Sequence, residues 1–325
     1  MSALANVAIH ASQFPDNVRR DLLQSLRSRK IAHKFHYDSI KQTQKWLALH
    51  QQFSPSRHDA DCRAIYGQGF EAVAQTITSK AVHLIGLGCG GGQKDSWLLK
   101  ILKAAGKETF YTPSDVAVAM VLTARQTALS VTPAKSCFPL VCDLETTSDL
   151  PAVFDSPAAR HAARIITFFG MIPNSEPGVI LPKLASLVGP KDFLLFSANL
   201  APGENYAVGV KKILPQYDNA PTRDWLMTFL FDLGVGKDDG KLRFEIETKS
   251  GLKRIVANFH FKRVCQIALE EKSFTFKPRE KIRLFFSYRY TSDRVQKALA
   301  AHKLEVSEHW IAKSGEEGVF LCRKR

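Results

Sequence analysis

The sequence predicts an α/β protein whose parallel, doubly wound sheet is interrupted by an inserted α+β region. Three observations predict this class. Short apolar runs alternate with amphipathic helical stretches between residues 81 and 200, as strands and helices do in βαβ units. A stretch of period-two alternation around a Ser-Gly turn follows, which is typical of antiparallel strands. A final helix and hairpin then complete the first sheet.

The first part of the chain is expected to be helical. Asp16 can cap a helix whose apolar residues Val18, Leu22 and Leu26 fall on one side. Further helices are expected over residues 38–53 and 62–79. Strands are then expected at 81–87, 109–116, 136–144, 164–172 and 192–200, with helices at 94–107, 116–129 and 178–189.

The alternation of strands and helices stops after residue 200. Beyond it we expect a helix at 223–236, antiparallel strands within 241–269, a strand at 281–291, a helix at 292–303 and a hairpin at 304–324. The predicted ligand-binding domain therefore consists of residues 61–204 and 288–325. The N-terminal helices have no place in its sheet, so residues 1–60 are assigned with 205–287 to a second domain.

Composition excludes several classes of protein. The 325 residues include 45 Lys+Arg against 31 Asp+Glu, a formal charge of +14 that attracts anions. The basic residues are scattered and no nucleic-acid-binding motif is visible, so a solvated basic face is favoured over a nucleic-acid partner. The six cysteines form no CxxC pair and match no zinc spacing. We see no signal peptide and no apolar run long enough for a membrane span, and we predict a cytoplasmic protein without a metal centre.

A glycine-rich loop, "GLGCGGGQKD", follows the first strand of the alternating region. Such a turn before a helix lets backbone N–H groups approach a ligand closely. A P-loop would end in GK[ST], whereas here Lys94 is followed by Asp95. The GxGxxG dinucleotide pattern fits only in part. The stretch "LIGLGCGGG" resembles the "LDLGCGTG" loop of class I S-adenosylmethionine (SAM)-dependent methyltransferases, except that Gly86 stands where that loop carries an acid.

Acidic residues at the ends of the next two strands support the same resemblance. Asp115 ends the second strand, ~20 residues after the loop, where an acid binds ribose hydroxyls. Asp143 and Leu144 end the third, where these methyltransferases hold adenine with an acid and an apolar side chain.

Other motifs resemble the histidine-specific methyltransferase family, in order along most of the chain. "KFHYDSIKQTQKWLALHQQFSPSR" is similar to its "FYD…LPEYYPTR", "FYTPSDVA" to "YVPVDVS", and "TFFGMIPNSEP" to "FLGSTIGNLTP". "LPQYDNAPTRDWLMTFL" is similar to "AYDD…TAAFN", and "IRLFFSYRYT" to "IHTEISCKF". The resemblance implies a SAM domain and a substrate domain built from the N-terminus and an insertion.

The resemblance also implies roles for single residues. Gly88, Gly90 and Lys94 would lie at the methionine moiety of SAM, Asp115 at its ribose, and Asp143 with Leu144 at its adenine. Tyr37 would stand near the methyl acceptor and could pass on a proton, although no strong general base is visible. In the same way, the resemblance implies acceptor contacts by Asn174 and Tyr217, at its carboxylate, and by Ser287, at its side chain.

Two further departures concern the acceptor. Where the histidine enzyme holds the imidazole with a tyrosine and a glutamate, this sequence has Phe53 and Phe285. Phenylalanine cannot hydrogen-bond a ring nitrogen, and an unpaired polar group on the acceptor costs ~1–3 kcal/mol. The two residues therefore predict an apolar or aromatic acceptor side chain rather than free histidine.

The resulting prediction is a SAM-dependent N-methyltransferase that acts on the amino group of an amino acid or related small molecule and releases S-adenosylhomocysteine. Two alternatives remain open at this point. The net charge allows a nucleic-acid methyltransferase, but "GMIPNSEP" stands where amino-methylating DNA enzymes carry a DPPY-type motif. Gly86 and the altered acceptor positions also allow a regulatory SAM-binding protein without catalysis.

Overall fold

The computed structural model describes residues 4–325, which divide into two compact units. Unit 1 contains residues 4–14, 53–200 and 290–325, and unit 2 contains 15–52 and 201–289. The sequence-based boundaries differ at the N-terminus, where residues up to 60 were all assigned to the second domain. Residues 8–9 instead form a strand of the unit 1 sheet, a pairing too short to give a periodic signal in the sequence.

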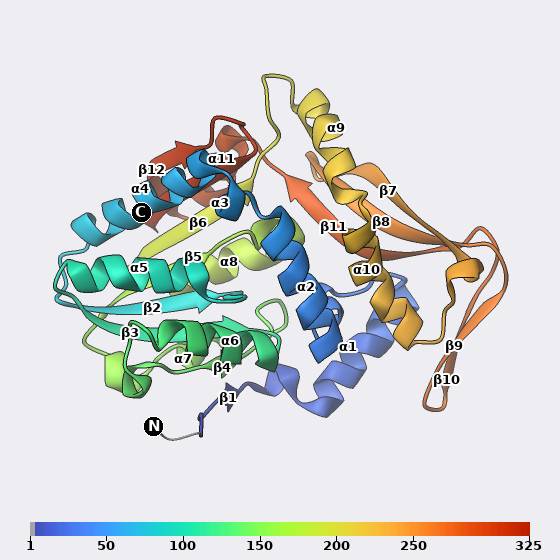
Figure 1. Cartoon of the computed structure of the whole chain (residues 1–325), viewed down its shortest axis with the longest axis horizontal. Coiled ribbons are helices and arrows are strands. Elements are labelled where there is room, and N and C mark those ends of the chain that lie inside the picture. Colours follow the sequence, from blue (N-terminus) through green and yellow to red (C-terminus); the bar gives the residue numbers. More distant parts are fainter. Residues whose placement is uncertain (1–3) are drawn as a thin grey trace. The chain divides into compact units, whose positions relative to one another are not determined.

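Unit 1 is built on an eight-stranded sheet of order β1-β4-β3-β2-β5-β6-β13-β12 (Figure 1). Its strands are β1 (Ala8–Ile9), β2 (Ala81–Leu87), β3 (Glu108–Asp115), β4 (Leu140–Val141), β5 (Ala163–Phe168), β6 (Phe193–Asn199), β12 (Leu304–Ile311) and β13 (Glu317–Lys324). Strand β13 runs antiparallel to β6. The chain proceeds outward in opposite directions from β2 and β5, so their carboxyl ends form the switch point where such sheets bind ligands.

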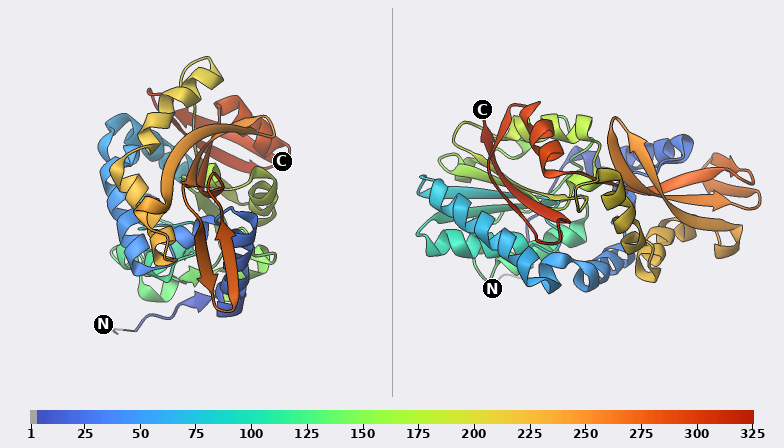
Figure 2. Two further views of the ribbon diagram at one scale, coloured as in Figure 1. Left: turned by 90° about the vertical axis from the view of Figure 1, so that its right-hand side faces the viewer. Right: turned by 90° about the horizontal axis from the view of Figure 1, so that it is seen from above.

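Helices cover both faces of this sheet, which confirms the predicted doubly wound class (Figure 2). On one face lie α4 (Ala60–Thr76), α5 (Gln93–Ala104) and α6 (Val118–Ala128), and on the other α7 (Leu150–Val153), α8 (Pro177–Leu187) and α11 (Ser292–Ala300). A short helix, α3 (Pro55–His58), precedes α4. The fully buried side chains of Phe70, Leu98 and Leu195 belong to the core cluster that joins α4 and α5 to the sheet.

Unit 2 combines helices with an antiparallel sheet of order β11-β8-β7. Its helices are α1 (Pro15–Ser28), α2 (Ile40–Phe53, whose last residue is counted in unit 1), α9 (Tyr206–Tyr217) and α10 (Ala220–Asp232). Its strands are β7 (Gly240–Lys249), β8 (Leu252–Phe261), β9 (Cys265–Leu269), β10 (Lys272–Phe276) and β11 (Lys281–Arg289). Strands β9 and β10 form a separate hairpin (Figure 1). The hydrophobic core of unit 2 includes Leu226, Phe259 and Ile282.

Two further elements, β4 and α9, differ from the sequence-based expectation. Strand β4 is limited to two residues instead of spanning 136–144, because Pro139 has no N–H to donate to a neighbouring strand. Helix α9 was not predicted, since Gly209 and Pro215 lower its helix propensity. Asn205 begins it by accepting a hydrogen bond from the backbone N–H of Val208 at 3.1 Å. No helix among residues 4–325 is long and apolar enough to cross a membrane.

Candidate functional site

The glycine loop between β2 and α5 requires its glycines. Gly88, Gly90 and Gly92 have left-handed φ angles of 61°, 51° and 74°. A Cβ on Gly88 would lie 2.6 Å from Met171 Sδ, and one on Gly92 would lie 2.7 Å from Ala124 Cα. The loop therefore keeps a bare backbone ahead of a helix N-terminus, which is the arrangement that lets N–H groups approach a ligand.

Asp115, the last residue of β3, is joined to this loop. One of its carboxylate oxygens accepts the backbone N–H of Gly90 at 3.2 Å, and the other accepts that of Ala117 at 3.2 Å. Burial raises the pKa of Asp115 to about 6, while these N–H bonds act in the opposite direction. Each carboxylate oxygen can still accept a further hydrogen bond, so the group can serve a hydroxyl-bearing ligand.

Asp143 and Leu144 form a turn directly after β4. Both are nearly buried, at 8% and 7% exposure. Asp143 accepts the backbone N–H of Glu145 at 2.9 Å. Lys183 donates to the carbonyls of Leu144, Glu145 and Thr147 at 2.9, 2.6 and 2.7 Å. The turn thus presents a carboxylate beside an apolar side chain in a fixed backbone, which suits a flat base with an exocyclic amino group.

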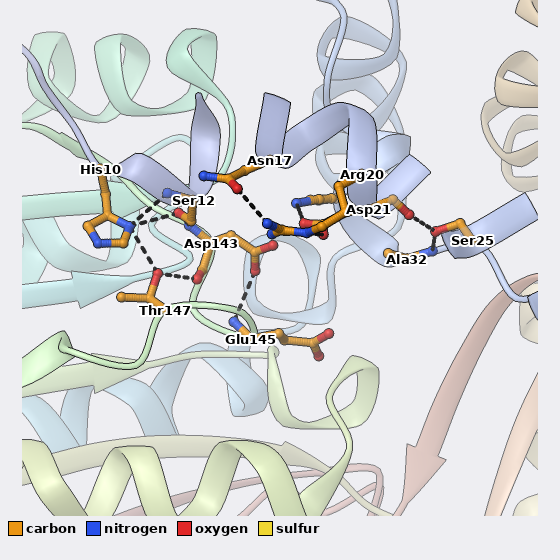
Figure 3. Close-up of polar contacts among 11 residues, drawn as sticks. His10, Ser12, Asn17, Arg20, Asp21, Ser25, Ala32, Asp143, Glu145 and Thr147 are labelled. Carbon is orange, nitrogen blue, oxygen red and sulfur yellow. Dashed lines mark hydrogen bonds and ion pairs between the residues drawn. The ribbon is translucent and has the colours of Figure 1, made fainter. Parts of the chain in front are cut away.

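The N-terminal segment also bonds to this turn (Figure 3). Ser12 Oγ accepts the backbone N–H of Asp143 at 3.0 Å. His10 Nδ1 accepts the backbone N–H of Ser12 at 3.0 Å, so in a neutral His10 the ring proton lies on Nε2, 3.2 Å from Asp149 Oδ1. Thr147 lies 3.2 Å from the same Nδ1. Sequence reasoning missed this support because it arises from pairing between distant segments.

Lys94, in the first turn of α5, is held in a buried polar network. Its ammonium donates to Tyr66 Oη at 2.8 Å and lies 3.9 Å from the centroid of that ring. Tyr66 Oη also lies 2.9 Å from Ser197 Oγ and bonds to Glu317, and its single proton is donated to one of these two partners. Burial lowers the pKa of Lys94, and the nearby Glu317 carboxylate opposes that change. Lys94 is therefore a cation held in a fixed position. Its partners Tyr66, Ser197 and Glu317 lie in no motif that the sequence reveals.

In unit 2, strand β11 and helix α9 bring several predicted residues together. Phe285, Ser287 and Arg289 alternate along β11 and share one face of it. Tyr217, at the end of α9, has its hydroxyl 2.7 Å from Ser287 Oγ and accepts a hydrogen bond from Arg289 Nη2 at 2.8 Å. The Tyr217 and Phe285 ring centroids lie 6.0 Å apart, and those of Trp225 and Phe285 lie 6.1 Å apart.

This face, which we call the β11 face (Tyr217, Trp225, Phe285, Ser287 and Arg289), is polar at one end and aromatic at the other. The guanidinium and the two hydroxyls lie at the polar end, whereas Phe285 is 7% exposed among rings at the aromatic end. Sequence reasoning did not select the arginine. Its position two residues after the serine, on the same face of a strand, was the available signal.

The remaining predicted residues are distributed over both units. Tyr37, in unit 2, packs its ring 5.6 Å from Trp225 and 5.8 Å from Trp46, so it reaches the β11 face through a shared tryptophan. Asn174 ends a short helical turn after β5 in unit 1. Phe53, also counted in unit 1, is 45% exposed at the end of α2.

The sequence profile described as "Histidine-specific methyltransferase, SAM-dependent" matches residues 18–324. The chain belongs to this family. As a member of the histidine-specific methyltransferase family it is a SAM-dependent methyltransferase, and SAM is its cofactor. The match begins after the segment that contains Ser12 and His10. No curated protein sequence shows significant similarity to the chain.

Solved methyltransferase structures resemble the chain only distantly. The CcbJ methyltransferase from Streptomyces caelestis is 14% identical, with 79% of this chain and 95% of that chain covered and a TM-score of 0.39. The sugar N-methyltransferase KedS8 from Streptoalloteichus is 14% identical, with 85% and 92% covered and a TM-score of 0.38. CalS10, a SAM-bound amino pentose methyltransferase from Micromonospora echinaspora, is 14% identical, with 86% and 96% covered and a TM-score of 0.40. At these scores the likenesses carry no argument about the reaction.

Proposed function

We propose that this chain N-methylates the amino group of an amino acid or related small molecule that has an apolar or aromatic side chain, and that free histidine is not its acceptor. The β11 face carries the proposal. It offers a guanidinium and hydroxyls at one end and aromatic rings at the other, which matches the carboxylate and the side chain of such a molecule.

Unit 1 supplies the residues that fit the cofactor. Gly88 and Gly90, whose left-handed backbone angles favour residues without a Cβ, suit the methionine moiety, with Lys94 in the following helical turn. Asp115 would bind the ribose hydroxyls, and Asp143 with Leu144 the adenine. When bound, SAM supplies a methyl group activated on a sulfonium, so the protein has to align the acceptor and exclude water.

The polar end of the β11 face would bind the acceptor carboxylate. Arg289 is 5% exposed, and a buried guanidinium is suited to a carboxylate because it offers paired donors and a positive charge. Arg289 already donates a hydrogen bond to the hydroxyl of Tyr217. Tyr217 is the residue that the family resemblance places at the acceptor carboxylate. The family resemblance also assigns Asn174 to the acceptor carboxylate and Ser287 to the acceptor side chain.

The aromatic end argues against histidine as the acceptor. Phe285 stands where the resembled histidine enzyme has a glutamate, and its ring is packed against Tyr217 and Trp225. An imidazole at this end would leave a ring N–H without an acceptor, and such an unpaired group costs ~1–3 kcal/mol. Phe53, the other departure from the resembled pattern, likewise lacks a hydrogen-bonding group for an imidazole.

The chain's part in the reaction is mainly alignment. The acceptor amine has to be neutral to attack, so a proton must leave. Tyr37, held by Trp46 and Trp225, would pass that proton to water. The aromatic packing around Tyr37 fixes the direction of its ring, which is what alignment requires.

A methylation screen tests the proposal directly. The purified chain is incubated with isotopically labelled SAM and single amino acids, aromatic amines, DNA or RNA, and methylated products are identified by mass. We expect label on the amino nitrogen of an apolar or aromatic amino acid. Robust turnover of histidine or of nucleic acid, or no methylation of any amine by protein that binds S-adenosylhomocysteine, would contradict the proposal.

A substitution at the polar end tests the assignment of the carboxylate. Arg289→Met should raise the KM for the acceptor by about tenfold or more, the scale of one lost charge-assisted hydrogen bond, while the affinity for S-adenosylhomocysteine stays the same. Arg243→Met, on the exposed side of β7, is the matched control and should leave both constants unchanged. Equal acceptor KM values in the two variants would remove Arg289 from the site.

A further inference from the structure

Asp95, in the first turn of α5, occupies the space beside the glycine that replaces the usual acid of the loop. It is 3% exposed. A Cβ built on Gly86 would lie 3.1 Å from Asp95 Cγ. It would lie even closer to Asp95 Oδ2, at a separation shorter than real Cβ atoms show. Any side chain at position 86 is therefore incompatible with Asp95 where it stands.

The Asp95 carboxylate also bonds to strands on both sides of β2. Tyr111 Oη, on β3, donates to Oδ2 at 2.8 Å, and Thr167 Oγ1, on β5, donates to Oδ1 at 2.8 Å. Gly86 lies between these strands on β2 and pairs in register with Pro113 and Thr167. One carboxylate thus connects β3 and β5, the two strands that flank β2.

We propose that Asp95 supplies from α5 the carboxylate that position 86 of β2 lacks, and that it acts as a positioning residue for the cofactor loop, residues 88–92. Its low exposure argues that it acts through the loop rather than by touching the cofactor. A carboxylate in the first turn of a helix is favoured by the helix dipole. The inference rests on SAM binding and is independent of which acceptor is methylated.

The surroundings of Asp95 shift its pKa in opposing directions. Burial raises its pKa to about 6, while the Tyr111 and Thr167 hydroxyls and the neighbouring Lys94 charge lower it. At neutral pH the group is therefore mainly a carboxylate that accepts both hydroxyl bonds. Loss of that carboxylate would leave two buried hydroxyls without their acceptor.

A reciprocal exchange tests the proposal with the whole chain. Gly86→Asp, Asp95→Thr and the double variant are compared with the wild type by calorimetry with S-adenosylhomocysteine and by thermal unfolding without it. We expect the affinity of each single variant for S-adenosylhomocysteine to fall by about tenfold or more, which is the scale of one unsatisfied buried polar group. The double variant should recover to within about threefold of the wild type, because the carboxylate returns on β2 without a clash.

The coupling between the two positions decides the outcome. Gly178→Asp, at an exposed glycine with open space around it, is the matched control and should bind normally. Asp95→Thr that binds like the wild type would overturn the proposal, and so would a double variant no better than Asp95→Thr. If Gly86→Asp does not fold, the comparison of Asp95→Thr with the double variant still decides. A double variant that regains thermal stability but not affinity would reduce Asp95 to a structural role and also overturn it.

Discussion

Asp115→Ala is expected to weaken the binding of S-adenosylhomocysteine by about a hundredfold or more, the scale of two lost hydrogen bonds to a charged acceptor. The ribose would lose its acceptor, and the N–H of Gly90, now bonded to the carboxylate at 3.2 Å, would lose its support. Methyl transfer should fall in parallel. Calorimetry with the product measures the first effect without any knowledge of the acceptor.

The matched control is Asp155→Ala, an exposed acid of unit 1 that pairs with Arg164 at 3.3 Å. Exposed pairs of this kind contribute little to stability, so this variant should bind normally. If folded Asp115→Ala protein binds S-adenosylhomocysteine as well as the control does, the ribose lies elsewhere and the strand-end assignment fails.

The same carboxylate predicts opposite pH effects on stability and on affinity. The folded pKa of about 6 lies above the ordinary 3.8, so the folded chain binds this proton more tightly than the unfolded chain does. The Asp115 contribution to stability therefore increases as pH falls from about 6 to about 4. Affinity for the cofactor product should fall over that range, because the ribose hydroxyls need the ionised acceptor. Asp95 titrates in the same range, so the difference between wild type and Asp115→Asn isolates Asp115.

The unit 1 sheet was predictable because its signals are local. Strand β2 is buried at every residue and reads as one apolar run, and the glycines after it require left-handed angles. Strand β1 and the shortened β4 were not predictable, since two-residue strands have no period and depend on pairing between distant segments. Helix α9 was missed because tertiary packing on β7 and β8 outweighs its poor propensity.

The strand-end acids of the candidate site were predicted from their places at strand ends and from the family resemblance, whereas their supporting contacts were not predicted. Ser12 reaches Asp143 across 131 positions of sequence, and Arg289 reaches Tyr217 across 72. Asp95 appeared in the sequence only as a residue that spoils a P-loop pattern. Its contacts with Tyr111 and Thr167 exist only once three strands lie side by side, and no single-sequence pattern encodes that.

Phe285→Glu is expected to reduce kcat/KM for the apolar acceptor by about a hundredfold, because a buried carboxylate would replace the ring that we propose to face the acceptor side chain. Phe14→Glu is the matched control, since that phenylalanine is 52% exposed, and it should leave the kinetics unchanged. S-adenosylhomocysteine binding should be equal in both variants, which separates loss of acceptor recognition from loss of the fold.

The direction of the change in specificity is the sharper test. A glutamate at 285 would lie beside the Tyr217 and Trp225 rings and could accept a hydrogen bond from an imidazole N–H, which phenylalanine cannot do. The ratio of histidine turnover to apolar turnover should therefore rise in Phe285→Glu, even if both rates fall. If that ratio stays at the wild-type value while the apolar rate drops, residue 285 only packs the core, and acceptor choice must be attributed to other residues. A rise confined to histidine, absent for lysine, would place the acceptor side chain at the aromatic end of the β11 face.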